Sequence, residues 1–266
     1  MTGVFESTSA PPYPEGRNLL AGKSVLVTAS AGTGIGFATA KRCAEEGATV
    51  MLSDIHEGRL ERCADELAEL VGQDVPRALC DIRSSDAVAA LVTRAESELG
   101  GIDVLVNNAG LGMTRKIIDT SSEEWLRLLD INLKGPFRTM RAALPAMIER
   151  GSGSIINLSS ICAWRAEAGQ SAYGASKAGV LALTRCAAME SAESGVRINA
   201  LVPSLAIHPH LEKVSSPEFL AKMVRENEVL GRGAETWEIG NAAVFLASDY
   251  SSYMTGEALS VSCRRA

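Results

Sequence analysis

Residues 24–36 read Ser-Val-Leu-Val-Thr-Ala-Ser-Ala-Gly-Thr-Gly-Ile-Gly. The first six residues are mostly apolar or β-branched and predict a strand over Ser24 to Ala29. A turn ending Gly34-Ile35-Gly36 follows, and the amphipathic stretch after it predicts a helix. Backbone N–H groups at such a helix start favour a pyrophosphate. A glycine turn alone is weak evidence, but it places candidate ligand contacts at Ser30, Gly34 and Ile35.

Short β-rich runs alternate with longer amphipathic runs along the rest of the chain. The β-rich runs are Ser24 to Ala29, Thr49 to Ser53, Arg77 to Cys80, Ile102 to Asn107, Ser154 to Ser159, Arg197 to Leu201 and Ala258 to Ser262. The helical runs include Phe37 to Glu46, Arg59 to Val71, Ser122 to Glu149 and Ser171 to Glu193. This alternation predicts an α/β protein with a doubly wound parallel sheet and helices on both faces.

Composition favours one large domain. The 266 residues are 46% hydrophobic and 22% charged, which suits a single substantial core. Residues 1–20, with Pro11, Pro12 and Pro14, predict an N-terminal arm, either extended or a disordered tail. Residues 21–266 are then expected to form the folded domain. No internal repeat is evident.

Charge and cysteine usage exclude several classes of protein. A net charge of -6 and a pI near 5.3 argue against nucleic acid or an anionic membrane surface as a partner. The six cysteines lack paired metal spacing and read as reduced packing residues. Neither a signal peptide nor an apolar run of about 18 residues is evident. We therefore expect a soluble cytoplasmic protein.

Asp54 follows the second predicted strand, eighteen residues after Gly36. In this position a carboxylate binds the adenosine ribose hydroxyls of a dinucleotide and repels a 2′-phosphate. The glycine turn also contains no Lys or Arg. Both observations favour NAD over NADP. The alternative is that Asp54 only caps the following helix.

Three polar residues further along predict acid–base chemistry. Tyr173 and Lys177 are four apart and share one face of a predicted helix. An adjacent ammonium, and a positively charged oxidised nicotinamide, lower the pKa of a phenol and favour its phenolate. Ser160 ends the preceding strand and is placed to hydrogen-bond a substrate oxygen. Taken alone, the Tyr and Lys are most often a surface contact, and the serine a turn.

These motifs resemble the short-chain dehydrogenases/reductases over residues 21 to 263. The glycine turn, Asp81, Asn107 to Gly110 and Asn132 appear in the order of that family, followed by the Ser, Tyr and Lys. The resemblance implies a Rossmann-type seven-stranded sheet in a single domain. It also implies an oxidoreductase that interconverts a secondary alcohol and a ketone with a nicotinamide dinucleotide, and commonly a homotetramer assembled through 122–149 and 171–193.

The resemblance also implies cofactor contacts. Asp81 and Ile82 are expected to bracket the adenine, and Asn108 and Gly110 to pack beside the adenosine half. Pro203 is expected to contact the cofactor near the nicotinamide.

Catalytic roles follow from the same resemblance. Tyr173 is expected to exchange a proton with the substrate oxygen, which Ser160 holds. Lys177 is expected to bind the nicotinamide ribose and to depress the tyrosine pKa. Asn132 distorts its helix and holds a water that links Lys177 to solvent.

The chain departs from the family pattern in three places. The glycine turn is one residue long and starts Thr28-Ala29 where the family has Thr-Gly, so we expect a reshaped loop. Residues 203–208 replace Pro-Gly by Pro-Ser and put His208 where the family has Thr. Ser262-Cys263-Arg264 replaces Asp-Gly-Gly near the C-terminus. The substrate specificity is expected to lie in these differences and in residues 203–227, a predicted lid.

Candidate substrate contacts are Trp164, Arg165 and His208. Arg165 suits an anionic group on the substrate, although a solvated arginine is the commoner interpretation. His208 and His210 flank one proline, but no cysteine or carboxylate cluster lies near them in sequence, so we predict no metal site.

Four segments together resemble an actinobacterial subgroup that serves steroid breakdown: the turn over residues 28–36, Trp164-Arg165-Ala166, Pro203-Ser204 and residues 248–257. Members of that subgroup oxidise a ring hydroxyl on a bicyclic propionyl-CoA fragment of the sterol C and D rings. Two alternatives stay open: a 3-oxoacyl-thioester reductase of fatty acid synthesis that uses NADPH, and a catalytically silent dinucleotide-binding protein. Asp54 counts against the first, and the intact Ser, Tyr, Lys and Asn against the second.

Overall fold

The structure is a computed structural model that describes residues 8–264, without the side chains of His210 and Val214. One sheet of seven strands runs in the order β3-β2-β1-β4-β5-β6-β7. Every neighbouring pair is parallel. The strands are β1 (Ser24–Thr28), β2 (Thr49–Asp54), β3 (Arg77–Leu79), β4 (Val104–Asn107), β5 (Gly153–Leu158), β6 (Val196–Pro203) and β7 (Ala258–Val261). The predicted Rossmann-type architecture is confirmed.

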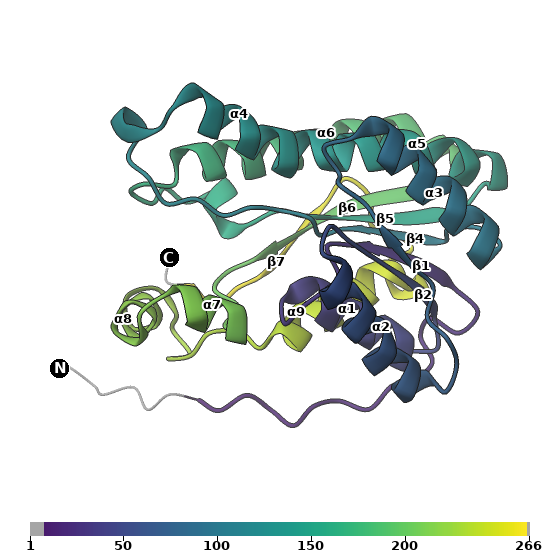
Figure 1. Ribbon diagram of the computed structural model, residues 1–266, viewed down its shortest axis with the longest axis horizontal. Coiled ribbons are helices and arrows are strands. Elements are labelled where there is room, and N and C mark those ends of the chain that lie inside the picture. The colour runs from purple at the N-terminus through teal and green to yellow at the C-terminus, as the bar shows by residue number, and fades with distance from the viewer. Residues whose placement is uncertain (1–7, 265–266) are drawn as a thin grey trace.

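Helices cover both faces of the sheet. They are α1 (Ile35–Glu45), α2 (Glu57–Val71), α3 (Ser85–Leu99), α4 (Ser122–Leu129), α5 (Gly135–Arg150), α6 (Ser171–Ser191), α7 (Pro209–Val214), α8 (Pro217–Asn227) and α9 (Thr236–Ala247). Helices α3 to α6 lie on one face, and α1, α2 and α9 on the other (Figure 1). Each face buries its own apolar cluster against strands that are hydrophobic on both sides.

Several short helical segments join these elements. They are η1 (Ile117–Asp119), the π-helix η2 (Asp130–Lys134), η3 (Ile161–Ala163), η4 (Ala192–Ser194) and η5 (Asp249–Ser251). The helical stretch expected over Ser122 to Glu149 is present, and the π-helical turn η2 joins its two parts, α4 and α5. The helix expected to reach Glu193 ends at Ser191 and continues as η4.

The described part of the predicted arm lies along helices α1 and α9 (Figure 1). The Tyr13 ring lies 5.4 Å from that of Trp237, and its hydroxyl donates to Glu45. The carboxylate of Glu46 accepts from the backbone of Arg17 and Leu19. This stretch is thus held by specific contacts.

The strand order reverses between β1 and β4, so the loops after these two strands diverge at the carboxyl edge of the sheet. The lid sequence 203–227, whose conformation the sequence does not predict, forms α7 and α8 beyond that edge (Figure 1). No helix within residues 8–264 is long and apolar enough to cross a membrane.

Candidate active site

A cavity of about 350 Å³ lies at the carboxyl ends of β4, β5 and β6. The predicted site residues that line it are Ile35, Asn108, Gly110, Ser160, Tyr173, Lys177, Pro203 and His208. They come from the glycine turn, the loops after three strands, and helix α6. Residues far apart in sequence are thus brought to the switch point of the sheet.

The three expected catalytic side chains lie together, with Ser160 and Lys177 buried and Tyr173 half-buried. Tyr173 and Lys177 lie on the first two turns of α6, and Ser160 follows β5. The Lys177 ammonium lies 5.8 Å from the centre of the Tyr173 ring and donates to the Leu158 carbonyl at 2.7 Å. Lys177 is 4% exposed and Ser160 8%. The cluster faces the cavity with little contact to bulk water.

Burial dominates the protonation of this cluster. It raises the pKa of Tyr173 to about 12, an effect that the hydrogen bond with Ser160 only partly offsets. It also lowers the pKa of Lys177 to about 8. The expected depression of the tyrosine pKa by Lys177 is therefore wrong for the protein by itself, because desolvation outweighs the distant ammonium.

Asn132 lies in the π-helix η2 and is fully buried. Its side-chain oxygen accepts from the Leu111 amide at 2.7 Å, and its amide nitrogen donates to the Leu111 carbonyl at 2.9 Å and to the Ser176 hydroxyl at 3.0 Å. The helix distortion that the resemblance implied is present. Asn132 ties the loop after β4 to α6, and a relay through a water stays a prediction.

The glycine turn has an unusual start. Ala29, where the family pattern has glycine, adopts φ +49°, in the left-handed region that favours glycine. The Asn108 side chain holds it there by donating to the carbonyls of Ala29 at 2.9 Å and Thr28 at 3.2 Å. A Cβ at Gly36 would lie 2.3 Å from both the Ala29 oxygen and the Asn108 nitrogen. Glycine is required at this point by close approach.

The glycine turn is held against β2 and α2 by contacts of its own backbone and side chains. The Ala31 amide donates to Asp54, and the Gly32 amide lies 3.1 Å from the Cys63 sulfur of α2. Ser30 is 0% exposed, and its hydroxyl bonds the backbone of Ser53 in both directions. Ser30 therefore positions the turn against β2 rather than presenting its side chain to a ligand.

Asp54 ends β2 and is 6% exposed. Its carboxylate accepts from the amides of Ala31 at 3.1 Å and His56 at 2.9 Å. Burial raises the pKa of Asp54 above its usual value, and the Ala31 bond and the Arg59 charge partly offset this. Helix α2 is capped at His56, not at Asp54. Arg59, 3.8 Å from the carboxylate, is a neighbour that sequence reasoning missed.

The expected adenine residues differ in exposure. Asp81 forms a bidentate pair with Arg83, whose guanidinium holds the pKa of that carboxyl below its usual value. Ile82 is 9% exposed, and a Cβ at Gly135 would lie 2.5 Å from its Cδ1. Arg138, which the sequence did not flag, donates to the Ile82 carbonyl and to Asp130. It fixes η2 against the loop that follows β3.

Two of the three departures from the family pattern meet at one buried carboxylate. Glu228, just after α8 and 3% exposed, accepts from the Ser204 hydroxyl at 3.2 Å, the Leu205 amide at 3.4 Å and the Cys263 thiol at 3.0 Å. The loop after β6, the end of α8 and the C-terminal segment therefore share an anchor. Sequence reasoning missed Glu228 because nothing in its neighbourhood marks it as buried.

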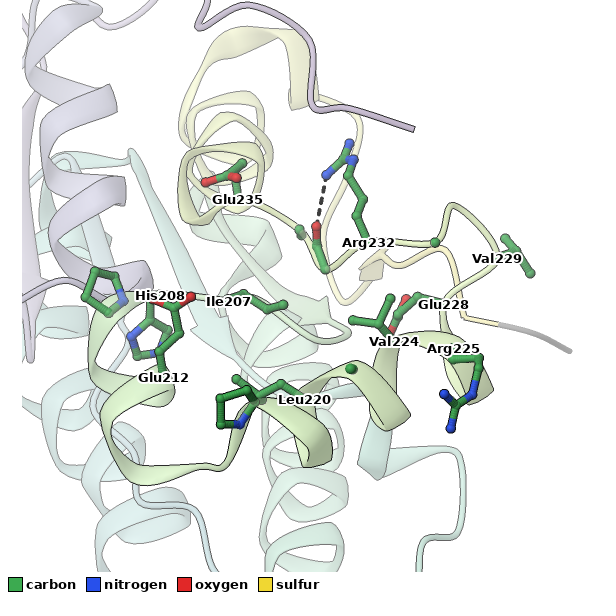
Figure 2. A pocket seen from close by; sticks show the side chains of 16 residues that line it. Ile207, His208, Glu212, Leu220, Val224, Arg225, Glu228, Val229, Arg232 and Glu235 are labelled. Atoms are coloured by element: carbon green, nitrogen blue, oxygen red, sulfur yellow. Dashed lines mark hydrogen bonds between the residues drawn. The ribbon is translucent and has the colours of Figure 1, made fainter. Parts of the chain in front are cut away.

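The expected substrate residues are not in one place. His208 lines the catalytic cavity and also a larger one of about 970 Å³ beneath α8 (Figure 2). A Cβ at Gly34 would lie 3.9 Å from the His208 ring, which therefore lies over the glycine turn. Trp164 is 49% exposed, and Arg165 lines a separate cavity. No group of three metal-ligating side chains occurs among those that the structure describes.

Comparison with known proteins agrees with this geometry. A family model described as enoyl-(acyl carrier protein) reductase matches residues 29–263. A crystal structure of a short chain dehydrogenase from Mycobacterium smegmatis is similar with a TM-score of 0.86 and 47% identity, covering 97% of this chain and 99% of that one. The chain belongs to the short-chain dehydrogenase/reductase family. It is an oxidoreductase, and the family binds a nicotinamide dinucleotide.

Named relatives within the family differ in substrate. A (5R,7aS)-5-hydroxy-7a-methyl-1-oxo-2,3,5,6,7,7a-hexahydro-1H-indene-carboxyl-CoA reductase of Mycobacterium tuberculosis is 50% identical, with 96% of this chain and 97% of that protein covered. A 3-oxoacyl-[acyl-carrier-protein] reductase of Thermotoga maritima is 37% identical, with 91% and 97% covered. A 7 alpha-hydroxysteroid dehydrogenase complexed with NADH has a TM-score of 0.86 at 32% identity, with 92% and 95% covered.

Proposed function

We propose that this chain is an NAD-dependent dehydrogenase that interconverts a ring alcohol and its ketone on a bicyclic carboxyl-CoA thioester from steroid breakdown. The observation that carries the proposal is that Ser160, Tyr173 and Lys177 line one cavity at the switch point. The substrate class is supported by the relative that shares half of its residues and acts on such a thioester.

The residues present fit a nicotinamide dinucleotide. Helix α1 has no side-chain cap and no acidic residue in its first turn, which suits a pyrophosphate. Gly110 lies where a Cβ would be 3.3 Å from the Lys177 nitrogen, so backbone and ammonium form one surface for a ribose. When bound, the dinucleotide supplies the hydride acceptor or donor of the reaction.

Side chains of the protein carry out the acid–base catalysis. In the direction of oxidation, Tyr173 takes the hydroxyl proton while the carbon loses its hydrogen with the electron pair. Ser160 donates a hydrogen bond to the substrate oxygen and keeps it within reach of the phenol. Because the pKa of Tyr173 is raised to about 12 by burial, a positive charge in the cavity must stabilise its phenolate. The Lys177 ammonium and the oxidised nicotinamide provide it.

The choice of NAD over NADP rests on Asp54. Its buried carboxylate at the end of β2 is fixed by two backbone amides, so it meets a ribose diol without reorganisation. Arg59 lies beside it and would favour a 2′-phosphate if the carboxylate were absent. A structural neighbour binds NADH.

The second candidate is a 3-oxoacyl-thioester reductase. It is supported by relatives named 3-oxoacyl-[acyl-carrier-protein] reductase, whose substrate is an acyl group attached to an acyl carrier protein. Asp54 opposes it, because such an enzyme is expected to use NADPH. A catalytically silent role is opposed by the complete set of catalytic side chains.

Assembly and location are part of the same proposal. Helices α4, α5 and α6 expose large apolar side chains, which suit a homotetramer. They are Leu126, Phe137, Ile148 and Met189. Light scattering after gel filtration tests this, and a monomer contradicts it. All six cysteines are unpaired, which suits a reducing cytoplasm.

The test is a panel of alcohols given to the purified protein with NAD. We expect turnover of a hydroxylated bicyclic CoA thioester at a kcat/KM at least about tenfold above that of simple cyclic alcohols. Failure to oxidise any such thioester, with good oxidation of the simple alcohols, contradicts the proposal. A preference for 3-oxoacyl thioesters with NADPH moves the second candidate to first place.

A further inference from the structure

A cavity of about 590 Å³ lies next to the catalytic cluster and belongs to neither the cofactor nor the lid. Its walls are η1 with the preceding Lys116, the turn from Cys162 to Gly169, and the start of α6. Ser171 and Gly174 line it and flank Tyr173 in sequence, and Cys162 follows Ser160 by two residues. The cavity therefore begins within two residues of both catalytic hydroxyls.

Two loops are joined at the edge of this cavity. The Arg115 amide donates to the Gly169 carbonyl at 2.8 Å, and the Gln170 side chain donates to the Thr114 hydroxyl at 2.9 Å. These bonds fix the loop after β4 to the turn after β5. The walls are therefore positioned by hydrogen bonds before any ligand arrives.

The apolar part of the cavity is exposed. Ile117 is 69% and Ile118 86% exposed, although both are large aliphatic side chains. Isolated exposed apolar residues are ordinary, but two adjacent ones lining a concave site are typical of a binding surface.

The polar part of the cavity is incompletely satisfied. The side-chain oxygens of Gln170 and Ser171 are buried and have no hydrogen-bond partner among the described residues. Buried polar atoms are normally paired, so these two oxygens mark a place where a ligand N–H gains a hydrogen bond.

The charged part of the cavity is positive. Lys116 and Arg165 line it, and its acidic residue, Glu167, lies 3.6 Å from the guanidinium of Arg264. Two cations and one carboxylate line the cavity, and that carboxylate is also close to Arg264, so the net charge of the lining is positive and attracts an anion.

We propose that this cavity binds the pantetheine arm and phosphates of the CoA moiety of the substrate. The arm carries amide N–H groups, an apolar dimethyl segment and a phosphorylated end, which match Gln170 and Ser171, Ile117 and Ile118, and Lys116 and Arg165 respectively. The cavity starts beside the catalytic hydroxyls, so a thioester leading away from a bound ring has a short path to it. This inference rests on the proposed thioester substrate.

The experiment compares two esters of the same hydroxylated bicyclic acid, one with CoA and one with N-acetylcysteamine. The short ester keeps the thioester but lacks the phosphates. For the wild type we expect a higher kcat/KM with the CoA ester, through KM. In the double variant Lys116→Gln/Arg165→Gln, we expect kcat/KM for the CoA ester, divided by that for the short ester, to fall about tenfold. A loss of this size is what two partly exposed ion pairs contribute.

Controls separate the outcomes. Arg94→Gln removes an exposed cation from α3, which lines neither cavity, and keeps the wild-type ratio. Increasing salt raises KM for the CoA ester more than for the short one. An unchanged ratio in the double variant, with both esters active, overturns this inference alone. A wild type that oxidises neither ester overturns the proposed function. If Ile118→Ser changes the oligomeric state and not the ratio, the surface is a chain–chain contact and the inference is wrong.

Discussion

The cofactor side and the substrate side of the active site are built from different kinds of contact. On the cofactor side, Ser30, Asp54 and Asn108 are buried or half-buried, and each bonds to the backbone of a neighbouring segment. On the substrate side, the cavity near α6 has exposed isoleucines and two buried oxygens for which residues 8–264 provide no hydrogen-bond partner. Ser30, Asp54 and Asn108 are thus paired within the chain, whereas the oxygens of Gln170 and Ser171 have hydrogen-bonding capacity left.

This difference indicates which side of the active site determines substrate specificity. A polar group already paired within the protein holds a fixed shape and serves the part of the reaction that every turnover shares. A polar group without a partner gains most from the right ligand. The substrate side is therefore where this chain selects what it oxidises, and substitutions on the two sides are expected to change different kinetic constants.

The largest effect is expected at the catalytic tyrosine, which the two sides share. Tyr173→Phe removes the proton acceptor and should lower kcat by about 10³-fold or more, since acid–base catalysis contributes about 10²- to 10⁴-fold. The dissociation constant for NADH should change little. Stopped-flow turnover and fluorescence titration measure the two quantities. Tyr250→Phe, at a residue 73% exposed, is the matched control. Unchanged turnover in Tyr173→Phe removes that residue from the mechanism.

A smaller but selective effect is expected at Asp54. Asp54→Ala removes the carboxylate and leaves Arg59 free to meet a 2′-phosphate, so the NADH over NADPH preference should fall by about 10²-fold. Asp65→Ala, on the exposed face of α2, is the control. Fluorescence titrations with each cofactor give the preference. If Asp54→Ala weakens both cofactors equally, the residue only supports the turn.

Glu228 joins the two sides, and its loss should be felt on the substrate side. Glu228→Leu leaves Ser204, Leu205 and Cys263 without their common acceptor, so the lid base loosens and KM for the alcohol rises about tenfold. Glu228→Gln keeps an acceptor oxygen and should recover most of this loss. Glu226→Gln, two residues earlier and exposed, is the control. Equal defects in the Leu and Gln variants contradict the anchoring role.

Lys177 makes the stability of the cofactor side depend on pH. Its pKa is lowered from 10.5 to about 8 by burial, so the folded protein carries a penalty below pH 8 that is relieved as pH rises towards 10.5. Over that window the free energy of unfolding of the wild type should rise relative to Lys177→Met by up to about 3 kcal/mol. Denaturant unfolding at several pH values measures this. A constant difference across the window contradicts it.

The smallest effect is expected at Ala29. Ala29→Gly relieves a left-handed alanine, which costs about 1–2 kcal/mol, but adds glycine's entropy in the unfolded chain. The net gain is about 1 kcal/mol, or a rise in Tm of about 2–4 °C. Calorimetry measures Tm. A fall in Tm shows that the turn does not suffer from its alanine.

The sequence predicted where the residues of the expected cofactor side lie in the fold, because their signals are local, and their roles stay predictions. Spacing or strand position is enough to identify the glycine turn, Asp54 and the Tyr173–Lys177 pair. The substrate side depends on packing between distant segments, such as Glu228 against Cys263 and Thr114 against Gln170, which no local pattern encodes. The prediction that the pKa of Tyr173 is lowered was wrong for the same reason. Burial, which depends on distant segments, sets the direction of the shift.

The measurement that tests this account most directly is a titration of the purified wild type with NADH and, separately, with NADPH, following fluorescence transfer to the reduced nicotinamide. The account predicts tighter binding of NADH, by about tenfold or more, because Asp54 is fixed to meet a ribose diol. Tighter binding of NADPH would contradict the assignment of Asp54 and favour the biosynthetic reductase.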